Sequence, residues 1–426
     1  MKQVLRNLKL SNGSGADIAI ENGLVVEIGK ISGSDGLDCA GLVAFPGFVD
    51  LHTHLREPGF EGSETVLTGS QSGVAGGYTA LLAMANTDPV ADNAGTVEQV
   101  LDLGKKANYL QVQPIGAVTK GLEGKELAAL GSMNRSRANV TVFSDDGHCV
   151  YDPLVMRRAL EYVKGFGGVI AQHCQDPRLT EGSQMNEGAL SSELGLVGWS
   201  SVAEESIIAR DALLAEKVGG RLHICHLTTA GAVDVVRWAK KRGIKITAEV
   251  TPHHLLLTED LVRSYDPVYK VNPPLRTSED TEALRQGLLD GTIDVLATDH
   301  APHSIEKKDC EWDNAAFGMV GLETAASVLY KVLIEVGGSD LSHFERVISS
   351  TPAKIAGLGN QGHISVGSEA NLALFDPSSS RTISSHTHSK STNNPFSGVT
   401  LPGFVVHTLY KGEFKIRDQK LQVLDV

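Results

Sequence analysis

The most informative stretch of this chain is Val49-Asp50-Leu51-His52-Thr53-His54-Leu55-Arg56-Glu57-Pro58-Gly59. It continues the apolar run 42–48 and ends in a Pro-Gly break, a pattern that predicts a buried strand running into a loop. Because side chains alternate between the two faces of a strand, His52, His54 and Arg56 are expected to point the same way. Two imidazoles on one face can bind a metal ion, and an arginine beside them can hold an anionic substrate. A merely structural role for this pair is the weaker interpretation.

Length and composition limit the classes of protein to consider. A chain of 426 residues can form one large domain and a smaller one. The formal net charge of −13 argues against nucleic acid or an anionic membrane as a partner. Five cysteines without CxxC spacing favour a reducing compartment over a disulfide framework. The first residues lack the apolar core of a signal peptide, and no apolar run is long enough to span a bilayer, so a cytoplasmic protein is expected.

Apolar runs of strand length alternate with helix-like stretches through residues 46–355. The runs include 79–84, 111–115, 140–143, 168–171, 221–225, 245–250 and 293–297. The helix-like stretches include 195–218, 230–241, 277–289 and 321–335. This alternation predicts an α/β fold with parallel strands. A (β/α)8 barrel of the TIM type fits the length best, and a doubly wound open sheet is the alternative.

The two ends of the chain have a different pattern, made of short strands and turns. Residues 18–20 and 24–28 flank Asn22-Gly23, which predicts a hairpin. The strand-like segments near the other end are 370–375, 405–410 and 412–416. Neither end has enough strands to be stable alone. We therefore expect one small β-sandwich domain built from residues 1–45 and 356–426, beside a catalytic domain of residues 46–355.

Polar side chains follow several predicted strands at their carboxyl ends, where barrel enzymes carry their chemistry. Besides the first pair, the candidates are one of Asp145 and Asp146, then His173, His226 and Asp299. These groups offer enough nitrogen and oxygen donors for two divalent metals that share a bridging carboxylate. His223 and His226 have opposite strand parity, so His226 is the better ligand and His223 is expected to face the helices.

The remaining histidines are weaker candidates for the site. His253 and His254 follow a strand and either line a pocket or serve the structure. Residues 378–395 are polar and rich in Ser and Thr, so we interpret them as a loop, and the stretch with His386 and His388 as solvated. The charged stretch 304–315 is either a lid or a plain surface loop.

These motifs resemble the amidohydrolase superfamily, and most closely the bacterial class I dihydroorotases, over nearly the whole chain. The motifs that carry the resemblance are Asp50–Gly59, Met84–Thr87, Phe143–Gly147, Asn272–Arg276, Ala297–His303 and Phe317–Thr324. One departure is Ala315-Ala316-Phe317-Gly318, where family members often have Ala-Pro-Phe-Gly. The resemblance implies a barrel joined to a small β domain from both termini.

The resemblance also implies roles for individual residues. It favours Asp146 over Asp145 and implies one or two zinc ions per subunit, held by His52, His54, Asp146, His173, His226 and Asp299. It further implies that Asp299 acts as general base and acid. The implied contacts to the substrate carboxylate are Arg56, Asn86 and His303, and those to the pyrimidine ring are Asn272, Phe317 and Gly318.

The reaction implied is the reversible cyclisation of N-carbamoyl-L-aspartate to L-dihydroorotate in de novo pyrimidine (UMP) biosynthesis. In this scheme, metal-activated hydroxide attacks the ring amide while Asp299 transfers the proton. The family further implies a homodimer, and association with aspartate carbamoyltransferase as a partner to consider.

Two other interpretations remain. A hydantoinase, dihydropyrimidinase or allantoinase would share the fold, but a neutral hydantoin offers Arg56 nothing to bind, and the usual metal-bridging lysine is missing. A non-enzymatic partner of aspartate carbamoyltransferase would be expected to have lost metal ligands, whereas every proposed ligand is present here.

Overall fold

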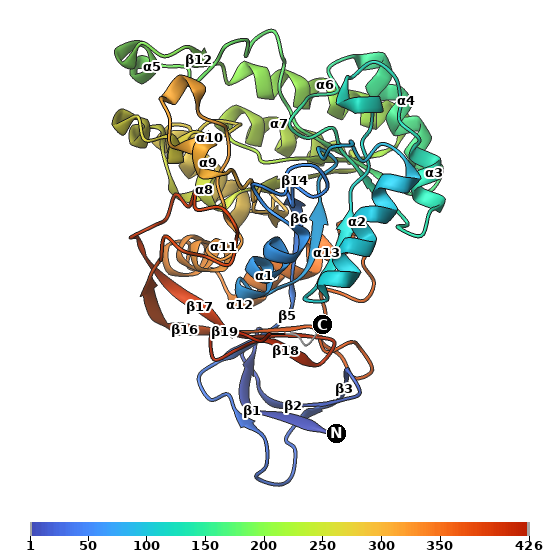
Figure 1. The fold of residues 1–426 in the computed structure, drawn as a ribbon, viewed down its shortest axis with the longest axis vertical. Coiled ribbons are helices and arrows are strands. Elements are labelled where there is room, and N and C mark those ends of the chain that lie inside the picture. The colour runs from blue at the N-terminus through green and yellow to red at the C-terminus, as the bar shows by residue number, and fades with distance from the viewer. Residues whose placement is uncertain (1, 424–426) are drawn as a thin grey trace.

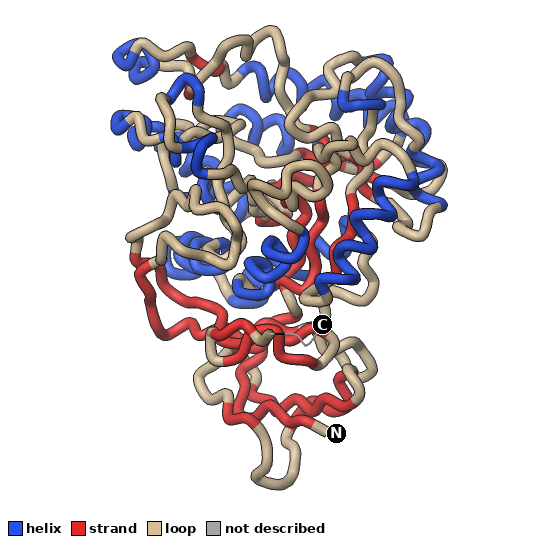
Figure 2. Tube along the Cα trace, in the orientation of Figure 1, coloured by secondary structure: helices blue, strands red, loops and turns tan. Residues whose placement is uncertain are grey.

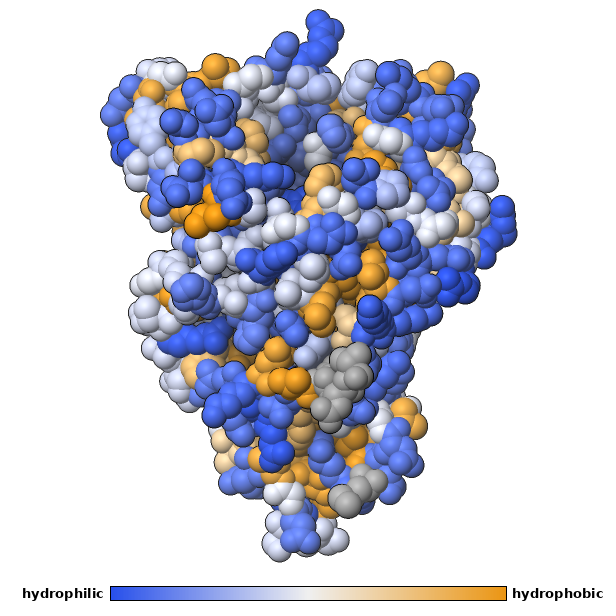
Figure 3. Space-filling model, viewed as in Figure 1, coloured by the Kyte–Doolittle hydropathy of each residue, from blue (hydrophilic) through white to orange (hydrophobic). Residues whose placement is uncertain are grey.

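The computed structural model describes residues 2–423 and has two parts. Figure 1 shows a helix-rich body above a sheet in which the two ends of the chain meet. Figure 2 shows strands both in that sheet and inside the body, where helices surround them. In Figure 3, hydrophilic residues cover most of the visible face, with apolar residues in smaller patches between them. No helix within the described range has the length and apolar character needed to cross a bilayer.

The terminal sheet combines strands from both ends of the chain. The N-terminal strands are β1 (Gln3–Leu10), β2 (Gly15–Glu21), β3 (Leu24–Gly29), β4 (Leu37–Asp38) and β5 (Val43–Pro46). The C-terminal strands are β16 (Leu372–Thr382), β17 (Thr400–Tyr410), β18 (Glu413–Arg417) and β19 (Lys420–Leu421). The order is β19-β18-β17-β16-β5-β1-β2-β3, with β4 beside β1. Antiparallel pairing of β5 with β16 joins the two ends.

The predicted hairpin is confirmed, because β2 and β3 pair antiparallel around Asn22-Gly23. Both turn residues have positive φ, 51° and 81°, as a tight hairpin turn requires. The sheet strands share one apolar core, to which Leu5, Ile18 and Leu372 contribute from three different strands. The hydrogen bonds form one continuous sheet rather than the two separate sheets of a simple sandwich. The domain boundaries at 45 and 356 stay predictions.

The body contains parallel strands in two sheets. One sheet holds β6 (Phe48–Thr53), β7 (Tyr78–Ala83) and β8 (Gln111–Pro114) in that order. The other has the order β15-β14-β13-β10-β9, with bounds β9 (Val142–Phe143), β10 (Val169–Gln172), β13 (Arg221–Ile224), β14 (Ile246–Val250) and β15 (Val295–Leu296). Isolated parallel bridges join Gly116 to Phe143 and Thr53 to His300 at the sheet edges. A two-stranded pair, β11 (Met185–Asn186) and β12 (Gly198–Trp199), lies apart from both sheets.

Helices follow most of these strands, so the predicted alternation is confirmed. The longer ones are α1 (Val66–Ala75), α2 (Ala94–Ala107), α4 (Pro153–Lys164), α6 (Val202–Val218), α7 (Ala230–Lys241) and α9 (Ser278–Leu289). The shorter ones are α3 (Leu130–Arg135), α5 (Ala189–Leu194), α8 (Pro252–Leu256), α10 (Ile305–Lys308), α11 (Ala325–Leu329), α12 (Leu341–Glu345) and α13 (Thr351–Ala356). Capping side chains mark where two of these helices begin. Thr229 caps α7 by accepting from the Ala232 N–H, and Asp152 caps α4 just before Pro153.

The parallel strands bury both of their faces. Leu222 and Ile224 of β13 join the large apolar layer that packs against the helices. The opposite face belongs to an inner cluster to which Val49, Leu51 and Cys225 contribute. Because Leu222 and Ile224 face the helices, His223 between them faces inward. The prediction that His223 faces the helices is therefore wrong.

The loop predicted over residues 378–395 is confirmed for 383–395, which form no helix or strand, and wrong for 378–382. Strand β16 runs on to Thr382, and four later side chains are buried: Ser389, Ser391, Asn393 and Asn394. His386 is exposed as expected, but His388 is half-buried and its backbone N–H donates to Glu323 at 2.6 Å.

Candidate active site

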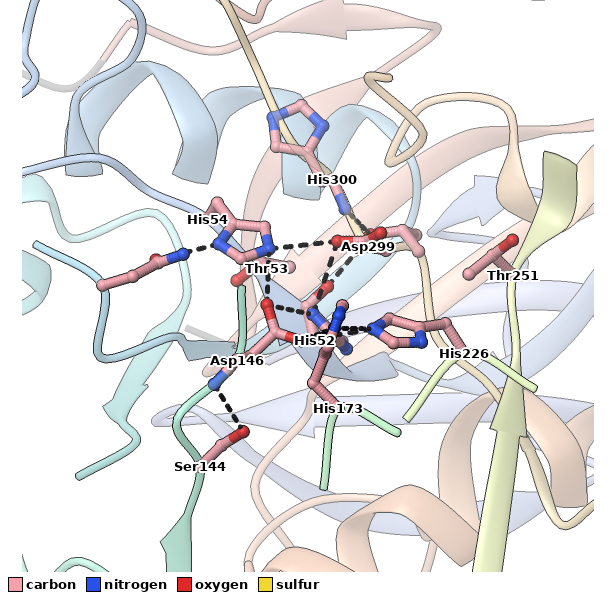
Figure 4. Close-up of polar contacts among 12 residues, drawn as sticks. His52, Thr53, His54, Ser144, Asp146, His173, His226, Thr251, Asp299 and His300 are labelled. Carbon is pink, nitrogen blue, oxygen red and sulfur yellow. Dashed lines mark hydrogen bonds and ion pairs between the residues drawn. The ribbon is translucent and has the colours of Figure 1, made fainter. Parts of the chain in front are cut away.

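The predicted ligands converge at the carboxyl ends of the parallel strands (Figure 4). The first pair lies against two carboxylates. His54 Nε2 is 3.0 Å from Asp299 Oδ1 and 3.3 Å from Asp146 Oδ2. His52 Nε2 lies 3.3 Å from the same Asp146 oxygen and 3.4 Å from Asp299 Oδ1. Each of these side chains is at most 6% exposed, so the charges meet in a medium that screens them weakly.

The second pair lies against the other oxygen of the same carboxylate. His173 Nδ1 and His226 Nε2 are each 3.2 Å from Asp146 Oδ1, and 2.9 Å from one another. Asp146 therefore places one oxygen against each histidine pair. Asp145 instead accepts from the backbone N–H groups of Val118 and Thr119. The structure thus puts Asp146, and not Asp145, in the cluster.

The donor set fits a divalent metal. His52 Nε2 is buried and has no hydrogen-bond partner, although carboxylate oxygens face it. Among the described residues, three groups have all their ligand atoms within 4.8 Å of one another: His52, Asp146 and His226; His52, His54 and Asp299; and His52, Cys225 and Glu249. Neutral imidazole with carboxylate is a ligand set suited to such ions. A cation there would also offset the clustered negative charge.

Glu249 supports the cluster and was missed from the sequence. Its Oε1 accepts from His52 Nδ1 at 2.6 Å, which leaves Nε2 of that ring free to face the carboxylates. The same carboxylate accepts from His223 Nε2 at 2.9 Å and from the backbone N–H of His226 at 3.2 Å. Burial raises the pKa of Glu249, but the two histidines outweigh it and lower that pKa to about 2. The residue is therefore an anion that orients two proposed ligands.

Three proposed site residues have left-handed backbones: Arg56 (φ 62°), His226 (φ 31°) and Asp299 (φ 46°). Such φ values are uncommon outside glycine and gather at functional sites. Strand β6 ends at Thr53, so strand alternation does not place Arg56. The expectation that Arg56 continues the strand is therefore wrong, and a local change of backbone direction places its side chain instead.

The residues proposed to bind the substrate carboxylate lie next to the histidine–carboxylate cluster. His54 Nδ1 donates to Asn86 Oδ1 at 3.0 Å, which leaves the Asn86 amino group for another partner. Arg56 Nη2 lies 3.4 Å from His303 Nε2, and Arg56 Nε donates to the Pro302 carbonyl. Burial, followed by the nearby Arg56, lowers the pKa of His303 to about 3. His303 is therefore neutral, and Arg56 provides the positive charge.

The proposed ring contacts form the neighbouring wall. His303 Nε2 donates to the Phe317 carbonyl at 2.7 Å. Gly318 has φ 147°, and a Cβ there would meet the Ala301 carbonyl at 2.8 Å, so this close approach requires glycine. Asn272 Nδ2 donates to Gln175 Oε1 at 3.3 Å, whereas its Oδ1 is buried with no partner.

The segment 304–315 folds into two short helical turns, α10 and a 3-10 turn over Trp312–Asn314. Lys308 Nζ donates to the Pro267 and Lys270 carbonyls, and Lys270 Nζ donates to the Trp312 carbonyl at 2.6 Å. Burial, with the neighbouring Lys270, lowers the pKa of Lys308 to about 7. The segment is thus hydrogen-bonded to residues 267 and 270. Its role as a lid stays a prediction.

Both histidines left open from the sequence are buried. His254 bonds Thr251 Oγ1 at 2.8 Å and the Pro273 carbonyl at 3.1 Å, a structural arrangement. The His253 ring lies 4.5 Å from that of His254, centroid to centroid, and is tilted by 52°, and its Nε2 is buried without a partner.

Together, the fold and the cluster define an α/β protein with a buried histidine–carboxylate site suited to divalent metal. A family model described as dihydro-orotase-like matches residues 41–232. A dihydroorotase of Leifsonia xyli subsp. xyli is 60% identical over 420 residues, covering 97% of this chain and 96% of that protein. A dihydroorotase of Streptomyces coelicolor is 57% identical over 425 residues, covering 99% of each chain. The chain belongs to the dihydroorotase family.

Solved structures match the fold over nearly the full length. The L-hydantoinase (dihydropyrimidinase) from Arthrobacter aurescens superposes with a TM-score of 0.88 at 23% identity, covering 99% of this chain and 98% of that one. A dihydropyrimidinase from Brevibacillus agri gives 0.85 at 23% identity, covering 99% and 96%. At this identity the likeness concerns the fold alone.

Proposed function

We propose that this protein catalyses the reversible closure of N-carbamoyl-L-aspartate to L-dihydroorotate in de novo pyrimidine biosynthesis. The observation that carries the proposal is a charged arginine beside the histidine–carboxylate cluster. Arg56 comes two residues after His54, and burial lowers its pKa only to about 10, so it keeps its charge at neutral pH. The two named relatives are dihydroorotases. Among cyclic amides, one bearing a carboxylate suits this arginine, whereas a neutral hydantoin would leave its charge unpaired.

The fold that we propose for the body is a closed (β/α)8 barrel. Within the described residues, the two parallel sheets comprise eight strands, β6 to β10 and β13 to β15. The bridge between Gly116 and Phe143 connects the β8 side to β9, and that between Thr53 and His300 connects β6 to the segment after β15. These links support closure, and the carboxyl ends of barrel strands are where such enzymes place their sites.

The metal that we propose is zinc, as one or two ions. His52, His54, Asp146 and Asp299 would hold one ion, and His173, His226 and Asp146 the other. When bound, zinc supplies a Lewis acid that acidifies water and polarises a carbonyl. Borderline-soft zinc suits imidazole and carboxylate donors.

Asp299 is the residue that we assign to proton transfer. Burial raises its pKa, but the positive charge of His52 and its contact with His54 hold the pKa well below the usual range. The side chain is therefore ionised, which is the form that a general base needs before it can accept a proton from the attacking water. It can return that proton to the ring nitrogen as the amide bond breaks, and in the biosynthetic direction the transfers run in reverse.

Other side chains hold the substrate in place. The Arg56 guanidinium can bind the free carboxylate through two parallel hydrogen bonds, with the Asn86 amino group beside it. The unpartnered Asn272 Oδ1 is suited to accept from a ring N–H. Holding both ends of the chain matters in biosynthesis, because an amide nitrogen is a poor nucleophile and needs orientation to attack.

Replacing Arg56 by lysine tests this assignment of the substrate carboxylate. We expect Arg56→Lys to raise the KM for L-dihydroorotate about 10- to 100-fold, because one point charge replaces a two-pronged contact. Zinc content should stay at the wild-type level. Steady-state kinetics and metal analysis of the same preparation measure both. An unchanged KM would contradict the proposal that Arg56 binds the substrate carboxylate.

Replacing Glu249 by glutamine tests whether this carboxylate orients the proposed metal ligands. Glu249→Gln keeps the shape but loses the charge that orients His52, so zinc affinity should fall about 10- to 100-fold. Competition with a chelator measures the affinity. Glu204→Gln is the matched control, because this buried carboxylate bonds Thr228 and has no hydrogen bond to a proposed ligand. Equal affinity in the two variants would show that Glu249 does not act on the metal site.

The homodimer, the association with aspartate carbamoyltransferase and the cytoplasmic location stay predictions from the family resemblance.

A further inference from the structure

The connection between β16 and β17 leaves the terminal sheet and reaches the helix-rich body (Figure 1). Its residues 389–394 include four buried polar side chains, although this part of the sequence is polar and rich in serine. Buried polar groups need partners, and for Ser389, Ser391 and Asn393 the partners belong to the body. The connection therefore belongs structurally to the wall of the active site.

Asn393 makes the central contacts of this connection. Its Nδ2 donates to the carbonyls of Ala301 and Gly318, both at 3.0 Å. Its Oδ1 accepts from the backbone N–H of His303 at 3.3 Å. Its own carbonyl accepts from the Val320 N–H at 3.0 Å. The side chain is 5% exposed, and its amide uses both kinds of hydrogen-bonding group.

These bonds cross between two backbone segments that carry proposed substrate contacts. One segment follows β15 and includes His303, and the other contains Phe317 and Gly318. Their direct backbone contact is the bond from the Ala301 N–H to the Met319 carbonyl at 2.8 Å. A side-chain bond from His303 Nε2 to the Phe317 carbonyl at 2.7 Å also joins them, and the Asn393 side chain adds three bonds to the same two segments.

The connection is itself held firmly on its other side. Glu64 is fully buried and accepts from the Ser389 hydroxyl and from the Lys390 N–H at 3.0 Å. Ser391 Oγ donates to the Ser63 carbonyl at 2.6 Å. Glu64 also pairs with His300 Nε2 at 3.2 Å. The segment that presents Asn393 is thus anchored to the loop before α1.

We infer that Asn393 is a positioning residue for substrate binding: it sets the distance between His303 and Gly318 from a segment outside the two sheets that form the site. The inference rests on the proposed function for the identity of the substrate. Its structural part, that Asn393 links the segment with His303 to the segment with Gly318, rests only on the four hydrogen bonds of Asn393 given above.

The variant Asn393→Asp tests the inference, because it keeps the shape while turning the two donated bonds into carboxylate–carbonyl repulsion. We expect the KM for L-dihydroorotate to rise about tenfold or more, with kcat within about threefold and zinc content unchanged. Amide hydrogen exchange should become faster in peptides covering 300–304 and 317–321. Should this variant not fold, Asn393→Ala removes the same bonds without adding charge and is measured in the same way.

The matched control is Asn394→Asp, which makes the same change one residue away. Asn394 bonds only within its own segment, to the Ser384 carbonyl and the Phe396 N–H. Its KM and exchange rates should match those of the wild type. A fall in kcat at constant KM, equal effects in both variants, or an unchanged KM and exchange in the Asn393 variant would each overturn the inference. A wild-type protein inactive on L-dihydroorotate would instead overturn the proposed function, and the exchange measurements would still test the tie.

Discussion

Asp299→Asn should reduce turnover of L-dihydroorotate by about 10²- to 10⁴-fold, the usual contribution of a positioned general acid–base group. The amide has nearly the same shape but cannot take a proton from water and return it to the ring nitrogen. His52, His54 and the bridging carboxylate remain in place, so zinc should stay bound. Steady-state kinetics at saturating substrate, with metal analysis of the same sample, would show both results.

The same strand offers a matched control at its other end. Asp294 accepts from Lys240 Nζ at 2.7 Å and from the Ala248 N–H at 2.9 Å, just before β15 begins. Asp294→Asn should leave kcat near the wild-type value. Substantial residual activity in Asp299→Asn with full zinc content would contradict the proton-transfer role.

Asp146→Asn should lower both zinc content and turnover, the latter to near the background rate. Its two oxygens face different histidine pairs, so a neutral amide weakens both halves of the proposed site at once. In this variant, the histidines and the one remaining carboxylate, Asp299, would have to hold the metal. Less negative charge would then attract the ion. Zinc per chain and turnover are the quantities to measure.

The neighbouring Asp145 provides the comparison. Asp145→Asn removes charged acceptors from the Val118 and Thr119 N–H groups and should cost about 1–3 kcal/mol of stability. Zinc content per folded chain should not change. If Asp145→Asn lost metal and Asp146→Asn kept it, the assignment of the bridging carboxylate would be reversed.

Much of the site could be predicted because ligands sit at strand ends. His52, Asp146, His173 and Asp299 each follow an apolar run, and parallel strands bring such positions together. The family resemblance was still needed to choose between Asp145 and Asp146. Strand parity could not choose, because the chain turns out of the strand at that point.

Parity failed wherever the backbone leaves extended geometry. The left-handed φ values of Arg56 and His226 break the alternation, so the reason given for placing Arg56 was wrong although the residue does lie at the site. His223 faces inward with Glu249, and the regular alternation of Leu222, His223 and Ile224 was the signal that could have shown this.

The role of Asn393 could not be read from the sequence. Serine-rich polar composition is typical of solvated loops, and only the tertiary contacts with Ala301 and Gly318 show that the segment is buried. Local composition carries no information about partners that lie 92 and 75 residues away in the sequence. Such failures of local prediction are expected at functional sites.

The most direct test compares hydrolysis of L-dihydroorotate, dihydrouracil and a 5-substituted hydantoin by the zinc-loaded protein. All three rings contain a cyclic amide, but only the first has the carboxylate that Arg56 is proposed to bind. We predict turnover of L-dihydroorotate alone, and its loss in Asp299→Asn. Turnover of the neutral rings with L-dihydroorotate left intact would contradict it.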